Sequence, residues 1–198
     1  MSQSDDDVDD DVRVLDPRSL RGLAHPLRMR LLGALREYGP ATASQLADRL
    51  GESSGATSYH LRQLAAYGFV TDDPERGKGR ERWWKAAHPR MRWGTDELLH
   101  HPDPSVRGAM NTMMHEVATT HGQQLSTWLG TLHEWPGGWR RGWDISDFTL
   151  RLTPELAREM LDKVHEVINS YREQEVDQDT AHSARYRVHL HGFPRDED

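Results

Sequence analysis

The chain of 198 residues contains no cysteine. Disulfide bonds, thiolate metal sites and thiol redox switching are therefore excluded. The sequence also lacks a run of about 18 apolar residues, and its first residues lack the basic and apolar zones of a signal peptide. We therefore expect a soluble, cytoplasmic protein with no membrane partner.

Motifs of catalysis are missing as well. The sequence has no Gly-rich phosphate loop, no nucleophile elbow and no pair of helical histidines with an intervening acid. We therefore expect no enzymatic activity and no cofactor.

Charge is divided into three blocks. Residues 1–15 carry a net charge of −5, residues 16–90 carry +5, and the remainder carries −7. An acidic protein with one basic block binds nucleic acid through that block and repels it elsewhere. We expect residues 1–15 to be a disordered acidic tail.

The centre of the basic block has the local signals of two short helices. Thr42 and Gln45 have the spacing of a capping box, and Gly51 ends the first helix. Ser53 or Ser54 can cap a second helix that runs to about Ala66. A short turn between two such helices is the plan of a helix-turn-helix, a DNA-binding unit.

The second helix has distinct buried and exposed sides. At roughly 100° per residue, Ser54, Thr57, Leu64 and Ala65 fall on the side of Leu61, and a polar side lies opposite. Small residues on the polar side permit close approach, and its longer side chains can donate to phosphates or base edges. We assign DNA contacts on and beside this helix to Ser54, Ala56, Ser58, Tyr59, Arg62 and Gln63.

A basic hairpin follows the second helix. Phe69 to Thr71 has the pattern of a strand, residues 72–79 form a turn, and residues 80–86 return as a second strand. Cationic side chains on such a hairpin can lie along a phosphate backbone. The hairpin residues that we assign to DNA binding are Arg76, Lys78, Arg80 and Arg82.

The segment from Leu20 to Ala86 resembles the ArsR-type winged helix-turn-helix transcriptional regulators. The resemblance rests on LAHPLRMRLLGAL, ATASQLADRLG, ATSYHLRQLAAYGFV and the RGKGRERWWK wing, and covers about a third of the chain. It implies a dimeric, repressor-like regulator with the helix from Ser54 in the major groove of double-stranded DNA. The cysteine-containing sensor sequence of the metal-sensing members has no counterpart, because ASQLADRLG occupies its place.

Residues 91–145 are predicted to form a long helix and a Trp-rich loop. From Pro104, apolar or aromatic side chains recur every three or four residues from Val106 to Trp135. Such a stripe packs either on its own domain or on a second copy, and its length favours a homodimer. Gly122 and Gly130 are candidate sites of a kink.

Residues 146–198 are predicted to form a small strand–helix–strand module. Alternating apolar residues flank an amphipathic helix that begins at Thr153 and Pro154. The expected fold class is α+β and mainly helical, with an N-terminal winged helix-turn-helix over residues 16–90, a dimerisation helix and this module.

Two hypotheses concern ligands of the C-terminal half. Aromatic side chains around a Gly-Gly break could wall a pocket for an organic effector, or they could simply pack in a core or a dimer contact; these are Trp128, Trp135, Trp139 and Trp143. Histidines offer only a weak case for metal, and we assign no metal site. His189 and His191 would project from the same face of a strand, a spacing that can chelate, and His100 and His101 could serve as interchain ligands.

The sequence thus predicts a sequence-specific transcriptional regulator that binds double-stranded DNA as a homodimer. Its C-terminal half would receive an organic effector or a protein partner. The alternative is a winged-helix adaptor whose C-terminal module binds a protein and whose DNA binding is weak.

Overall fold

The computed structural model describes residues 12–76, 82–88, 90–93, 95–172, 174, 176–177 and 180–195. Two compact units are present, and the boundary between them falls between Gly122 and Gln123. The predicted division at residues 15, 90 and 145 stays a prediction.

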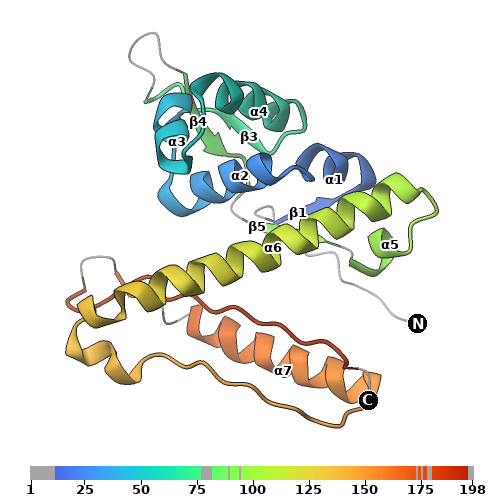
Figure 1. The fold of residues 1–198 in the computed structure, drawn as a ribbon, viewed down its shortest axis with the longest axis vertical. Helices are drawn as coiled ribbons and strands as arrows, with labels where there is room; N and C mark the ends of the chain where they lie inside the picture. Colours follow the sequence, from blue (N-terminus) through green and yellow to red (C-terminus); the bar gives the residue numbers. More distant parts are fainter. Residues whose placement is uncertain are drawn as a thin grey trace. The chain divides into compact units, whose positions relative to one another are not determined.

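The first unit contains the predicted helix-turn-helix. Helices α1 (Pro17–Leu23) and α2 (Pro26–Tyr38) precede α3 (Ala43–Leu50) and α4 (Ser54–Ala66) (Figure 1). Both predicted helix starts are confirmed by side-chain caps. Thr42 and Gln45 form the reciprocal capping box, and the Ser53 hydroxyl accepts from the backbone N–H of Ala56.

Three short antiparallel strands belong to the same unit, one before α3 and two after α4. In the order β2 (Ala41–Thr42), β4 (Trp83–Ala86) and β3 (Val70–Asp72), they form one sheet. Val70 lies opposite Ala86 and Asp72 opposite Trp84, which confirms the predicted hairpin. Lys78 and Arg80, two of the predicted DNA contacts, lie outside the described residues.

The last four residues of the predicted disordered tail, Val12–Leu15, form a strand, β1. It pairs in parallel with β5 (Arg90–Trp93). Leu15 is buried, and the Arg13 guanidinium donates to the carbonyl of Tyr67 at 2.5 Å. Burial of one side chain and a long-range hydrogen bond therefore order these four residues; residues 1–11 lie outside the described part of the chain.

One continuous core holds the first unit together. It joins Leu20 and Leu31 of the first two helices to Leu46 of α3, Leu61 of α4 and Phe69. All five side chains are at most 1 % exposed. Since removal of a buried leucine side chain costs about 2–5 kcal/mol, this core fixes the position of α4.

The long helix α6 (Pro104–Thr131) follows the short helix α5 (Thr95–Leu99). The predicted start at Pro104 is confirmed, and the helix continues through Gly122 without a break. Val106, Met110 and Met113 belong to the core of the first unit. The first part of the predicted stripe thus packs on its own domain rather than on a second copy.

The second unit contains α7 (Pro154–Arg172) after two short 3-10 helices (Leu132–Glu134 and Gly137–Arg141). The predicted helix is confirmed, but the flanking strands are not formed. Residues 143–152 and 184–195 belong to no strand in this structure. These strands were predicted only from the alternation of apolar and polar residues. A strand also needs a neighbouring strand to pair with, and neither segment is paired in the described part of the chain.

The fold is therefore α+β and mainly helical. An N-terminal helix-turn-helix with a small antiparallel sheet is followed by a long helix, as predicted.

Candidate nucleic-acid interface

The turn between α3 and α4 is short and sharply defined. Gly51 adopts a left-handed conformation with φ of 67°, which a side chain would disfavour. Its backbone N–H satisfies the carbonyl of Ala47, and α4 begins three residues later. Local sequence therefore sets the angle at which α4 leaves α3.

The two sides of α4 differ as the sequence predicts. Thr57, Leu61 and Leu64 are fully buried. The side chains of Tyr59 and Arg62 are exposed, whereas Gln63 is half-buried. Ser54 falls on the buried side of the helical wheel but is exposed, because it lies in the first turn, before the helix reaches the core.

A pocket lies where α3, α4 and the hairpin meet. It has a volume of about 230 Å³. The lining residues come from β2, α3, α4 and the hairpin, and are mostly hydroxyl-bearing or cationic: Thr42, Ala43, Ser44, Ser58, Arg62, Arg82 and Trp84. Two guanidinium groups and several hydroxyls around one small space form a chemical environment that suits a phosphate group.

Arg62 and Arg82 differ in how firmly their side chains are held at this pocket. The Arg82 guanidinium lies 4.2 Å from the ring centre of Trp84, and its Nε donates to Asp72 at 2.9 Å. Among the described residues, Arg62 makes no hydrogen bond or ion pair. Arg82 is thus held in place by its neighbours, while Arg62 has its donors available for a ligand.

Asp73 is a hairpin residue whose importance the sequence did not reveal. Its side chain is 8 % exposed and lies 3.6 Å from Lys85 and 3.9 Å from Arg76. Its backbone N–H donates to the carbonyl of Trp83. Asp73 therefore gathers two cations at the base of the hairpin, and Arg76, a predicted DNA contact, belongs to that group.

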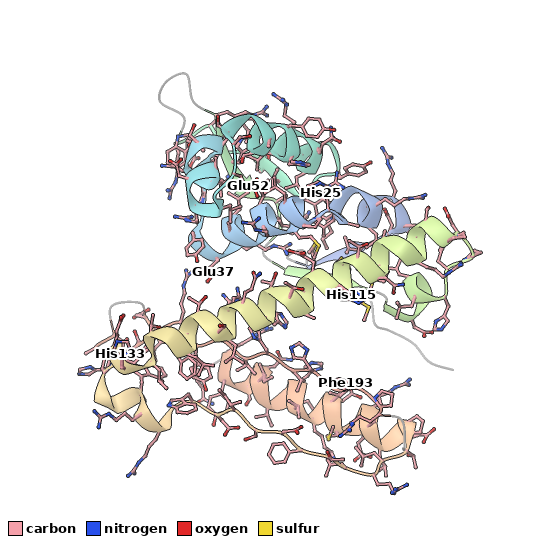
Figure 2. All side chains as sticks on the ribbon, viewed as in Figure 1. His25, Glu37, Glu52, His115, His133 and Phe193 are labelled. Carbon is pink, nitrogen blue, oxygen red and sulfur yellow. The ribbon has the colours of Figure 1, made fainter. Side chains whose placement is uncertain are left out.

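Two histidines connect α4 to α2. The rings of His25 and His60 lie 4.4 Å apart. His25, labelled in Figure 2, caps α2 by accepting from the backbone N–H of Leu27. Burial lowers the pKa of both imidazoles, with the Arg28 charge acting in the same direction. His60 is also influenced by His25, and more weakly in the opposite sense by Glu52. Both rings are therefore favoured in their neutral form.

The four predicted effector-binding tryptophans form two pairs rather than one cluster. Trp128 contacts Trp143 edge to face at 5.3 Å, and Trp135 contacts Trp139 at 6.1 Å. Trp139 also stacks on Tyr186, a neighbour that sequence spacing could not reveal. The effector pocket stays a prediction.

The candidate metal-binding histidines already have protein partners. His101 accepts from the backbone N–H of Asp103, and His189 bonds the Gln124 side chain at 3.1 Å. Within the described ranges, no three or more histidine, aspartate or glutamate side chains come together as a metal site. An interchain site remains an open hypothesis.

The length and hydropathy of the helices also bear on a membrane partner. Of the helices in the described part of the chain, none combines the length and apolar character that a bilayer span requires.

Comparison with known families agrees with the geometry of α3 and α4. Residues 23–73 match a family model described as a helix-turn-helix domain. This match spans α2, α3, α4 and the first strand of the hairpin. The N-terminal unit thus contains a helix-turn-helix domain.

Solved structures similar to the chain include two of ZitR from Lactococcus lactis. A double mutant in the apo form is 15 % identical, with 75 % of this chain and 83 % of that chain covered and a TM-score of 0.29. The wild type in complex with DNA is 13 % identical, with 88 % and 81 % covered and a TM-score of 0.28. No curated protein sequence matches the chain. Similarities this distant transfer no function to the chain.

Proposed function

We propose that this protein is a sequence-specific transcriptional regulator of the ArsR type, which binds double-stranded DNA in the cytoplasm as a repressor-like homodimer. One observation carries the proposal. The exposed side of α4 lies beside a pocket in which Arg62, within the helix-turn-helix match, and Arg82 of the hairpin meet. The absence of recognised catalytic motifs in the sequence favours a binding function over an enzymatic one.

The site divides DNA recognition into two tasks. The pocket of Ser44, Ser58, Arg62 and Arg82 takes one backbone phosphate. The phosphate then fixes the depth at which α4 enters the major groove. Ala56, Tyr59 and Gln63 are left to meet base edges, since they lie on α4 and do not line the pocket.

Regulation is assigned to the C-terminal half. An organic effector or a protein partner that binds two dimer geometries with different affinities would change DNA affinity by that difference. In a dimer, two copies of α4 would meet half-sites about one helical turn apart.

The experiment that tests the proposal is a gel shift with fragments from upstream of the protein's own gene. We expect a discrete complex at physiological salt that survives excess nonspecific DNA. Binding that is equal for all fragments and disappears at this salt would contradict sequence-specific regulation and favour the adaptor alternative.

A further inference from the structure

The hairpin carries two consecutive acids at the end of β3, Asp72 and Asp73. Both lie close to cations, but on opposite faces of the sheet. Asp72 lies directly opposite Trp84 in the β3–β4 register, and opposite residues of an antiparallel pair share a face. Asp73 is one residue further along, so it is turned to the other face, where it lies 3.6 Å from Lys85. Of the two acids, Asp72 is therefore the one on the face of Trp84, which lines the pocket.

Asp72 and Trp84 together fix the plane of the Arg82 guanidinium. Oδ2 of Asp72 accepts from Nε of Arg82 at 2.9 Å. One flat side of the guanidinium lies over the ring of Trp84, a buried side chain, at 4.2 Å from the ring centre. With the described residues, Nη1 and Nη2 of Arg82 make no hydrogen bond. The two terminal nitrogens are thus left for a ligand, on a guanidinium whose orientation is already set.

Asp72 is placed where its charge alone would weaken DNA binding. A carboxylate beside a phosphate-binding pocket repels the phosphate and offsets the charge of the nearby arginine. Folding does not require it either, because the side chains of Asp72 and Arg82 are 47 % and 55 % exposed, and ion pairs this exposed contribute little to stability. An effect of Asp72 that strengthens binding would therefore have to come from the orientation of Arg82.

We infer that Asp72 is a positioning residue for the DNA backbone: it holds Arg82 so that Nη1 and Nη2 meet the two non-bridging oxygens of one phosphate. Such a bidentate contact needs the planar guanidinium in one orientation. An arginine that is ordered before DNA arrives also loses less rotamer freedom on binding. The inference rests on the proposed function, because it takes the ligand of the pocket to be a phosphate of DNA.

Charge and orientation predict opposite signs, which fluorescence anisotropy of the full chain on a duplex of arbitrary sequence can separate. Asp72→Ala should lower the affinity by about fivefold or more, because a well-oriented charged contact is lost. Glu75→Ala is the matched control, since Glu75 is an exposed acid of the same hairpin and has no ion pair with any described residue. It removes the same charge and should raise the affinity or leave it within about twofold. Unchanged or higher affinity in Asp72→Ala would overturn the inference.

A double-mutant cycle tests whether Asp72 acts through Arg82. In an Arg82→Ala chain, Asp72→Ala should no longer lower the affinity, because only the repulsion between the acid and DNA is then removed. Arg82→Lys should lose nearly as much affinity as Arg82→Ala, since an ammonium keeps the charge but not the planar, two-pronged contact. Equal losses from Asp72→Ala with and without Arg82 would show that Asp72 acts on the fold, and would overturn the inference.

The choice of DNA separates this inference from the proposed function. A backbone contact carries no sequence information, so the measurement needs no operator. If no fragment from upstream of the protein's own gene is preferred, sequence-specific regulation is refuted, while the role of Asp72 is still decided on the arbitrary duplex. A wild type that binds no duplex at low salt would refute both.

Discussion

Ser44 of α3 and Ser58 of α4 line the same small pocket, beside Arg62 and Arg82. The helix-turn-helix thus brings two hydroxyls from separate helices to the place where the hairpin adds its cation. A phosphate held there would touch α3, α4 and the hairpin. Loss of this contact should lower the affinity for every DNA sequence equally.

The first prediction concerns the two arginines of this pocket. Arg62→Ala or Arg82→Ala should weaken binding to all sequences and reduce the slope of log affinity against log salt by about one unit each. Fluorescence anisotropy across a salt series measures both quantities. Arg172→Ala at the end of α7 is the control and should leave the slope unchanged; a loss of discrimination with Arg62→Ala would instead place this side chain on a base.

The second prediction concerns base contacts. Gln63→Ala should reduce the preference for the operator over altered sites by about 1–3 kcal/mol, because a lost bidentate contact affects one base pair. Competition with single-position operator variants locates that base pair. If affinity for all variants falls together, Gln63 contributes only to general binding.

The third prediction concerns pH. The pKa of His25 and His60 is lowered in the folded state from the ordinary 6.5, so the unfolded chain takes up protons first as the pH falls. Stability is then complete above about pH 7 and declines as the pH falls below 6.5. The charged or titratable groups around the pair are Arg28, Glu52 and Tyr59.

Urea denaturation between pH 7.5 and 5 tests this expectation. His60→Gln should flatten the dependence, whereas His133→Gln, on an exposed side chain of the second unit, should preserve it. An unchanged pH profile in His60→Gln would show that other groups cause the decline.

The fourth prediction compares two glycines of neighbouring helices. A Cβ at Gly22 of α1 would lie 2.4 Å from the Tyr67 ring, whereas a Cβ at Gly33 of α2 meets nothing within 4 Å. Gly22→Ala should therefore destabilise the protein by about 1–3 kcal/mol. Gly33→Ala should stabilise it by about 0.5–1 kcal/mol, since alanine is the better helix former.

Chemical denaturation of the two variants beside the wild type measures this difference. Equal stability of Gly22→Ala and the wild type would mean that Tyr67 moves aside at no cost.

The fifth prediction concerns metal. With no cysteine in the chain, reductants should not change operator affinity, and stoichiometric zinc or nickel should change it less than tenfold. Gel shifts with and without chelator measure this. A larger effect would direct mutagenesis to His100, His101, His189 and His191.

The helix-turn-helix could be predicted from sequence because its signals are local. The Thr42–Gln45 capping box and the left-handed Gly51 lie within ten residues of each other, and both are confirmed. The pocket could not be predicted in this way, because it depends on how β4 lies against α3 and α4. Ser44 and Arg82 are almost forty residues apart, and no spacing rule connects them.

Long-range strand pairing also explains why two predictions were wrong, the disorder of Val12–Leu15 and the strands on either side of α7. Val12–Leu15 was assigned to a disordered tail, since its partner strand lies beyond the hairpin. Conversely, residues 148–152 and 186–190 have the alternation of strands, but alternation does not provide a neighbour. The predicted dimer contact along the start of α6 is affected for a similar reason. Met110 and Met113 pack in the core of the first unit and are not available to a second copy.

The pairing of β1 with β5 has a consequence for synthesis on the ribosome. β1 leaves the ribosome before its partner, which emerges only after the helix-turn-helix and the hairpin have been made. β1 can therefore pair with β5 only after the helix-turn-helix has folded, and the side chains of Leu15 and Arg13 reach their final environment at that late stage. A fragment that begins at Asp16 would fold its recognition helix but leave β5 without its neighbour.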